Sequence, residues 1–359
     1  MKRRDFLDLV SRAAGGAAAL SLTSPAACAS EETHFSTWAW VHGGGEVGAD
    51  EWTRRFERLA AAGVTGVLVG GGDTTTLADL AHGAGLTFHR WIWVLNRTGD
   101  DWAKEAHPEW FSVSRKGESS LTTPPYVGYY QWVCPSREPV RDYLRQVVDE
   151  VAAHPGVDGV HLDYIRHPDV ILPIGLWEKY GLVQDRELPE FDFCYCDVCR
   201  TEFEKVSGSD PLSLSDPTAN EAWRRFRWDS VTGVVRALAD VVHARGKPIS
   251  AAVFPTPTLA RRLVRQAWDE WPLDMVFPMI YHSFYLKDLT WIGEAVRECV
   301  VAVPNTPLQA GLYLPDLTPD DLAEAIRLAR ANGAAGVSVF EMGGLSEPHL
   351  AVLGLRSRT

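Results

Sequence analysis

The chain has 359 residues, an apolar share of 46% and a formal net charge of −12. The length allows one large α/β barrel or two ordinary domains, and the apolar share supports a packed core, which excludes a disordered protein. The acidic balance argues against nucleic acid or an anionic membrane as a partner, because both require basic faces.

Residues 1–30 have the features of an export signal. Arg3-Arg4 stands before a small, apolar run and resembles the twin-arginine type of leader. The run is too short to span a membrane. Small residues precede Cys28 as in a lipoprotein box, but Pro25 stands where Leu is usual, so a lipid anchor at Cys28 and simple cleavage both stay open. We therefore expect an exported protein that is periplasmic, cell-surface or extracellular.

The mature chain, residues 31–359, alternates strand patterns with helix patterns. Short apolar runs that end at turn residues predict strands over 35–41, 64–69, 86–95, 157–163, 248–254, 274–281, 308–314 and 336–340. Apolar residues at helical spacing predict helices over 50–62, 76–84, 140–153, 222–245, 259–270, 289–299, 319–331 and 348–355, with Asp50 and Thr318 as N-caps.

Eight such pairs predict a single (β/α)₈ TIM barrel, with long insertions after the third and fourth strands, over about 96–135 and 169–217. A doubly wound sheet is the alternative. It is disfavoured because no strand-to-helix turn has the G-x-G-x-x-G form. In a barrel, the insertions and the carboxyl ends of the strands share the face that carries catalysis.

Four cysteines have the spacing of a metal site. Cys194, Cys196 and Cys199 form a C-x-C-x₂-C run, and Cys134 lies in the other insertion. Four thiolates suit a structural Zn²⁺, whereas a catalytic zinc would keep an open position. Two disulfides with distant pairing are the alternative in an exported protein. No organic cofactor and no obligate protein partner are expected.

The strand over 157–163 carries the leading catalytic candidate. Asp163 stands at its carboxyl end beside Tyr164, and His161 precedes them in an otherwise apolar run. The alternative is a structural carboxylate that caps the next loop or pairs with Arg166.

Hydrolysis of a glycosidic bond requires two carboxylates, one as proton donor and one as nucleophile or base. Asp163 and Glu341, at the ends of strands four and eight, are the predicted pair, with Asp163 as nucleophile or base and Glu341 as acid. Asp73 is a reserve acid. The predicted substrate-binding residues lie at strand ends or offer ring faces for sugars: Trp40, His42, Trp93, Asn96, His161, Tyr164, Arg166, Tyr281 and His282.

Five short segments together resemble a known group of barrel proteins: HPEWF at 107–111, CPS at 134–136, PVR at 139–141, DGVHLDY at 158–164 and FPMIY at 277–281. They resemble the glycoside-hydrolase-like, family-10-like group of exported bacterial proteins and lipoproteins, over about residues 35–345. The resemblance implies a TIM barrel that acts on carbohydrate.

Two further similarities are partial. The set Cys134, Cys194, Cys196 and Cys199 is similar to the zinc-binding cysteines of family 42 β-galactosidases, which implies a structural metal. The segment 158–164 is similar to the strand-four motif D-G-x-D-x-D-x-E of family 18 chitinases. His161 replaces the middle acid and Ile165 stands at the position of the catalytic Glu, so only Asp163 carries over.

The leading hypothesis is therefore an exported glycoside hydrolase. A carbohydrate-binding lipoprotein without activity is a second hypothesis. A zinc-dependent hydrolase that uses His161, His167 or His282 is a third.

Overall fold

The computed structural model describes residues 35–356. The expected export signal and Cys28 lie outside the described residues and stay predictions.

The described residues form eight parallel strands: β1 Ser36–His42, β2 Gly66–Gly70, β3 Thr87–Trp93, β4 Gly159–Asp163, β5 Ile249–Val253, β6 Met275–Pro278, β7 Gln309–Tyr313 and β8 Gly336–Phe340. Their order in the sheet is β6-β5-β4-β3-β2-β1-β8-β7. Parallel bridges from Val276 to Leu308 and from Met279 to Gly311 join the two ends. The strands therefore close into a (β/α)₈ TIM barrel, as predicted.

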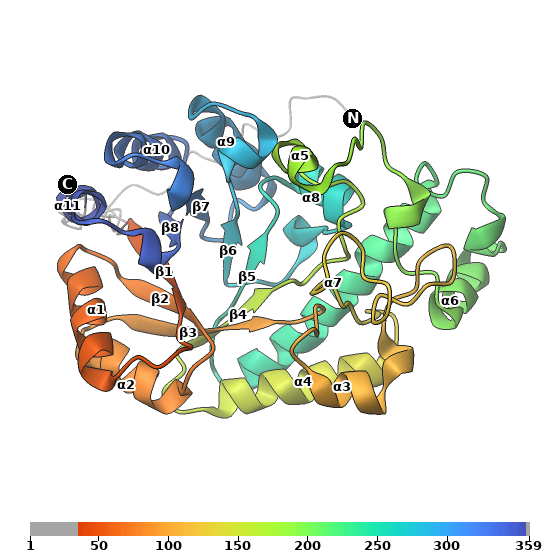
Figure 1. Ribbon diagram of the computed structural model, residues 1–359, viewed down its shortest axis with the longest axis horizontal. Helices are drawn as coiled ribbons and strands as arrows, with labels where there is room; N and C mark the ends of the chain where they lie inside the picture. The colour runs from red at the N-terminus through yellow and green to blue at the C-terminus, as the bar shows by residue number, and fades with distance from the viewer. Residues whose placement is uncertain (1–34, 357–359) are drawn as a thin grey trace, which may run out of the picture. The chain divides into compact units, whose positions relative to one another are not determined.

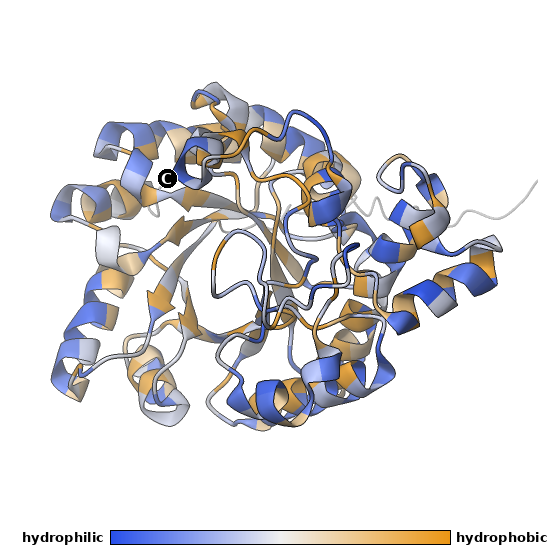
Figure 2. Ribbon diagram, turned by 45° about the vertical axis from the view of Figure 1, so that its right-hand side comes forward, coloured by the Kyte–Doolittle hydropathy of each residue, from blue (hydrophilic) through white to orange (hydrophobic). Residues whose placement is uncertain are grey.

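Eleven α-helices in the described residues surround or extend the barrel (Figure 1): α1 Ala49–Ala61, α2 Thr74–Gly83, α3 Asp101–Ala106, α4 Glu138–Ala153, α5 Trp177–Tyr180, α6 Asp197–Ser207, α7 Glu221–Ala244, α8 Pro257–Val264, α9 Thr290–Ala302, α10 Pro319–Ala331 and α11 Glu347–Arg356. The outer helices carry both hydrophobic and hydrophilic residues (Figure 2), which is typical of helices that cover a sheet. In the described part of the chain, none of them has the length and apolar character needed to cross a membrane.

Helix starts follow local capping chemistry. Thr318 caps α10 in a capping box with Asp321, as predicted. The prediction for Asp50 is wrong, because Gly48 is the N-cap and Asp50 lies in the first turn of α1, where its charge complements the helix dipole. Asp73 caps α2 by accepting a hydrogen bond from the backbone N–H of Thr76 at 2.9 Å.

The predicted helix over 259–270 is interrupted. α8 ends at Val264, Arg265 has a left-handed φ of 55°, and a separate 3₁₀ helix follows at Trp268–Glu270. The buried side chain of Arg265 forms ion pairs with Glu187 and Asp192. These partners lie far away in sequence, and the spacing of apolar residues gives no information about them. The pattern alone therefore predicts a continuous helix.

Aromatic rings fill the inside of the barrel. Trp40 packs edge-on against Trp91 and His161, each with ring centroids 4.9 Å apart. Space for such rings comes from glycine on the neighbouring strand, because a Cβ on Gly70 would lie 2.6 Å from the Trp91 ring. The barrel is therefore a packed core with an aromatic floor below its mouth.

Two connections at the carboxyl ends of the strands are long. Residues 94–137 join β3 to α4 and contain α3, and residues 164–220 join β4 to α7 and contain α5 and α6. They lie on the face of the barrel where strand ends expose side chains.

Candidate active site

A cavity of about 370 Å³ lies at the carboxyl ends of the strands. Its lining is mostly aromatic and includes residues from seven strand ends and from the connections after β3, β4 and β6: Trp40, His42, Trp91, Trp93, Tyr129, Tyr130, Asp163, Tyr164, Arg166, Asp169, Leu172, Pro173, Leu176, Lys179, Tyr180, Phe254, Met279, Tyr281, Phe284, Tyr285, Tyr313 and Phe340. An apolar hollow with a few polar groups is the usual form of a small-molecule or sugar site. We call it the aromatic cavity.

Asp163 is the last residue of β4 and is partly exposed in the aromatic cavity. Its Oδ2 accepts a hydrogen bond from Nε1 of Trp91 at 3.0 Å, and its Oδ1 accepts one from the backbone N–H of Tyr164 at 2.7 Å. Burial raises the pKa of Asp163 to about 6, against the lowering effects of these two donors and of Arg166. A carboxyl group with this pKa can carry a proton in a near-neutral range, which general acid–base catalysis requires.

The second acid in the cavity lining, Asp169, forms an ion pair with Arg166. Arg166 donates to Oδ2 of Asp169 at 2.9 Å, and both side chains are buried. The guanidinium also lies against the rings of Trp132, Tyr164 and Phe254 at 4.9, 5.4 and 5.1 Å. Arg166 therefore pairs with Asp169, and Asp163 is left with neutral hydrogen-bond donors.

Glu341 follows β8 and lies next to the end of β1. Its Oε2 is 2.7 Å from Nε2 of His42, and both side chains are partly exposed. The His42 ring packs against Trp91 with centroids 4.9 Å apart, and Trp91 holds Asp163. His42 and Trp91 therefore connect the two predicted catalytic carboxylates, although Glu341 itself is outside the cavity lining.

The structure brings most of the predicted site residues together. Seven of them line the aromatic cavity: Trp40, His42, Trp93, Asp163, Tyr164, Arg166 and Tyr281. Tyr281 has a raised pKa because of burial and the nearby Asp163, so its phenol stays neutral.

Three predicted substrate-binding residues lie away from the lining. His161 is fully buried below it and shares a hydrogen bond with Ser250 at 2.8 Å. Asn96 is buried, with its side-chain oxygen bound to the N–H of Thr98. His282 begins a 3₁₀ helix beyond β6, and burial lowers its pKa.

Several lining residues were not predicted. Trp91 is two residues before Trp93 on β3, so the two-residue period of a strand places both on the inner face and could have identified it. Tyr129 and Tyr130 belong to the connection after β3, where no periodicity reports which side chains reach the site.

The four cysteines of the insertions meet in one buried group. One ligand atom from each of Cys134, Cys194, Cys196 and Cys199 lies within 4.8 Å of the others, which is close enough to hold a metal ion. Cys134 Sγ is 3.4 Å from that of Cys199 and 3.6 Å from that of Cys196. The described cysteines are free thiols, without disulfides among them.

Among the described residues, these four cysteines are the group of three or more His, Cys, Asp or Glu side chains whose ligand atoms lie close enough together to hold a metal ion. His161, His167 and His282 form no such group there. The geometry thus gives no support to the hypothesis of a zinc-dependent hydrolase.

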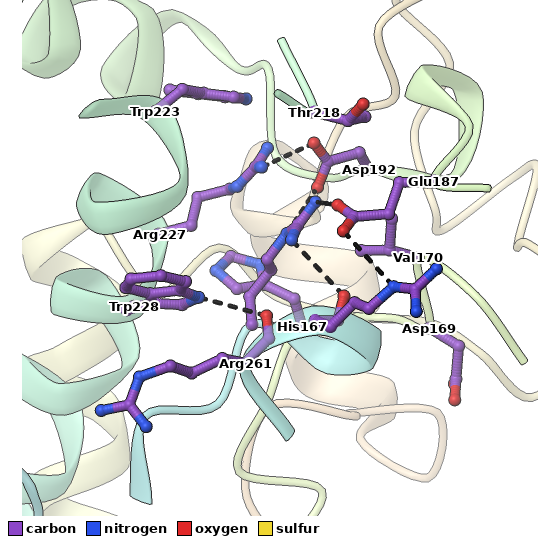
Figure 3. A network of polar contacts seen from close by, with 12 residues as sticks. His167, Asp169, Val170, Glu187, Asp192, Thr218, Trp223, Arg227, Trp228 and Arg261 are labelled. Atoms are coloured by element: carbon purple, nitrogen blue, oxygen red, sulfur yellow. Dashed lines mark hydrogen bonds and ion pairs between the residues drawn. The ribbon is translucent and has the colours of Figure 1, made fainter. Parts of the chain in front are cut away.

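A buried ionic network fixes the connection after β4 against two helices (Figure 3). Asp192 is fully buried and pairs with Arg227 of α7 at 2.5 Å. It also pairs with Arg265, beyond α8, at 3.2 Å. Glu187 pairs with Arg265 from the other side. We call Glu187, Asp192, Arg227 and Arg265 the arginine network. The same connection carries cavity-lining residues between Leu172 and Tyr180, so the arginine network and part of the lining belong to one segment of the chain.

The sequence matches no family profile, and no curated protein matches it significantly. Solved structures with a similar fold include the glycoside hydrolase domain of PgaB (BpsB) from Bordetella bronchiseptica, with a TM-score of 0.66, 11% identity and coverage of 89% of this chain and 98% of that chain. The catalytic domain of a β-amylase from Paenibacillus polymyxa has a TM-score of 0.60, 10% identity and coverage of 89% and 95%. A chitinase from Chromobacterium violaceum has a TM-score of 0.51, 10% identity and coverage of 89% and 99%. At these identities the similarity shows the fold, which is a barrel shared with glycoside hydrolases.

Proposed function

We propose that the protein is an exported glycoside hydrolase that cleaves O-glycosidic bonds of a poly- or oligosaccharide. The observation that carries this proposal is Asp163, a carboxyl group with a pKa of about 6 in an aromatic cavity at the mouth of the barrel. Aromatic faces stack on the apolar faces of sugar rings. The structural neighbours, which are named as a glycoside hydrolase domain, a β-amylase and a chitinase, add support from the fold.

The raised pKa changes the roles that the sequence suggested. A glycosidase keeps its proton donor in a desolvated position with a raised pKa, and keeps the partner carboxylate in a polar one. Asp163 fits the first description, and Glu341, hydrogen-bonded to His42 and partly exposed, fits the second. We therefore assign Asp163 as the proton donor and Glu341 as the nucleophile or base, the reverse of the sequence-based prediction.

The test is a screen of residues 31–359 against polysaccharides and aryl glycosides, with Asp163→Asn and Glu341→Gln in parallel. Loss of a positioned acid or base is expected to lower kcat/KM by about 10²–10⁴-fold. Aryl glycosides with good leaving groups distinguish the two roles, because their glycosidic oxygen needs little protonation. Asp163→Asn should leave their kcat/KM nearly unchanged, whereas Glu341→Gln should still lower it. Absence of hydrolysis on the whole panel by a folded protein would contradict the proposal.

One observation favours a second candidate, a carbohydrate-binding barrel without catalysis. Asp163 is the one acid of the cavity lining that has no cationic partner, and Glu341 lies outside the lining. Calorimetric titration of the same glycans discriminates the two: binding without cleavage, insensitive to Asp163→Asn, supports the binding protein.

We further propose that the four cysteines hold a structural Zn²⁺. A tetrahedral ZnS₄ unit with Zn–S bonds of about 2.3 Å separates its sulfurs by about 3.8 Å, close to the distances between Cys134 and its neighbours. Backbone N–H groups of Val113 and Cys196 point to Cys194 Sγ at 3.2 and 3.4 Å, as they do to metal thiolates. The ion would tie the connections after β3 and β4 together. Elemental analysis of the purified protein should find about one zinc per chain, lost in Cys199→Ser but not in Cys299→Ser.

A further inference from the structure

The wall around the aromatic cavity is uneven, because the connections after the strands differ in the helical turns that they contain. The long connections follow β3 and β4, and 3₁₀ helices follow β6 at His282–Tyr285 and β7 at Leu314–Asp316. After β1 and β2, by contrast, the helices begin within a few residues, at Ala49 and Thr74. No residue of these two connections, 43–48 and 71–73, lines the aromatic cavity.

The wall beyond β4, β6 and β7 is continuous. Gly175, after β4, lies so close to the turn after β6 that a Cβ would be 2.7 Å from the backbone oxygen of Ser283. The hydroxyl of Ser283 donates to the carboxylate of Asp316, which lies beyond β7. Phe284 packs edge-on against Tyr313 with ring centroids 4.9 Å apart. The connections after β4, β6 and β7 therefore close one end of the cavity.

On the side of β1 and β2, a second hollow of about 430 Å³ adjoins the cavity. It is lined by His42, Gly44, Gly70, Gly71, Trp91 and Trp93, and we call it the glycine-floored groove. His42, Trp91 and Trp93 also line the aromatic cavity, so the two hollows meet over these three side chains.

The floor of the groove is exposed backbone. Gly44 and Gly71 carry no side chain that would fill it, and a Cβ on Gly44 would have no atom within 4 Å. Arg90 fixes the second loop by donating to the backbone oxygen of Gly71 at 2.7 Å. Backbone N–H and C=O groups on a flat floor are suited to the hydroxyls of a sugar chain.

Both proposed catalytic carboxyls are bound to side chains at the junction of the hollows. Trp91 holds Asp163 and His42 holds Glu341. A bond cleaved between these two carboxyls would have one sugar in the aromatic cavity and the next over the glycine-floored groove.

We infer that the enzyme binds a glycan by its end: about one or two terminal sugar units occupy the closed aromatic cavity, and the rest of the chain leaves over the glycine-floored groove. This inference rests on the proposed function and adds that the cleavage is exo-acting.

The test uses cello-, xylo-, malto- and chito-oligosaccharides of two to six units, labelled at the reducing end. The wild-type protein should release one small product from a single end from the first time points. Gly44→Tyr places a ring in the groove, and it should lower the ratio of kcat/KM for the hexasaccharide to that for the disaccharide about tenfold, or about 1.4 kcal/mol of lost binding. Gly83→Tyr is the matched control, because Gly83 is exposed on α2 and its Cβ also meets no atom.

Internal fragments at early times, or an unchanged ratio in folded Gly44→Tyr, would overturn the inference and leave the hydrolase standing. Absence of hydrolysis of every series, with the polysaccharide panel also negative, would overturn the inference and the proposed function together.

Discussion

Asp163 shows how one side chain acquires an unusual proton affinity from its surroundings. Desolvation favours the neutral carboxyl, whereas the N–H donors from Trp91 and Tyr164 favour the carboxylate. Desolvation prevails and raises the pKa to about 6. The proton affinity of Asp163 is therefore set mainly by its burial at the end of β4, and the donors from Tyr164 and Trp91 limit the rise of its pKa.

If Asp163 is the proton donor, kcat/KM must decline as pH rises above about 6, because the free enzyme loses the required proton. Trp91→Phe removes a hydrogen bond that stabilises the carboxylate, so it should move this alkaline limb to higher pH. The measurement is a pH profile of kcat/KM for the substrate found in the screen. A limb that moves to lower pH in Trp91→Phe would contradict the assignment.

At the scale of elements, the connection after β4 carries part of the cavity lining on segments with little regular structure, because α5 has four residues and α6 lies outside the lining. The arginine network fixes this connection, because Asp192 links it to α7 and to the residue after α8. Removing one partner from a buried ion pair leaves an uncompensated charge, which costs more than the pair itself contributes.

Asp192→Asn is accordingly expected to lower the free energy of unfolding by about 3–5 kcal/mol, since it leaves buried arginines with one carboxylate less. Asp229→Asn is the matched control. Asp229 and its partner Arg225 are both about half exposed. This substitution should therefore lower the free energy of unfolding by less than about 1 kcal/mol. Urea unfolding checks both, and equal costs would contradict a special role for the network.

The sequence predicts elements better than it predicts the site. All eight strands lie within a few residues of their predicted ranges, because alternating strand and helix patterns are local properties of the chain. The interruption at Arg265 and the pairing of Arg166 with Asp169 depend on side chains brought together by folding. Asp73 stands at a strand end like Asp163, yet it caps α2, because a strand end sets only the face of the barrel and not the direction of the side chain.

At the scale of the whole molecule, buried histidines make stability depend on pH. Burial lowers the pKa of His89 to about 4 and of His167 to about 3, and it lowers that of His161 as well. Unfolded histidine titrates near about 6.5, so the unfolded chain binds more protons than the folded one below that pH. These histidines therefore leave the free energy of unfolding undiminished above about pH 6.5 and lower it progressively as the pH falls toward about 4.

We expect the free energy of unfolding to fall by about 2 kcal/mol for His89 alone between pH 7 and pH 5. Asp163 opposes this trend, because its raised pKa makes the folded state take up a proton between about 3.8 and 6. Asp163→Asn removes that opposition and should steepen the loss of stability on acidification. Urea unfolding at a series of pH values measures both slopes, and a shallower slope in the variant would contradict the assigned pKa.

The proposed function depends above all on catalysis by Asp163 at the mouth of this barrel. The most direct measurement is kcat/KM of Asp163→Asn and Asp73→Asn on the best natural glycan of the panel, not on an aryl glycoside with a good leaving group. Both variants remove an acid that follows a barrel strand, and Asn also serves as a helix cap, so Asp73→Asn should stay within about twofold of the wild type. A loss of about 10²-fold or more is expected in Asp163→Asn alone. Full activity in Asp163→Asn, or equal losses in the two folded variants, would contradict it.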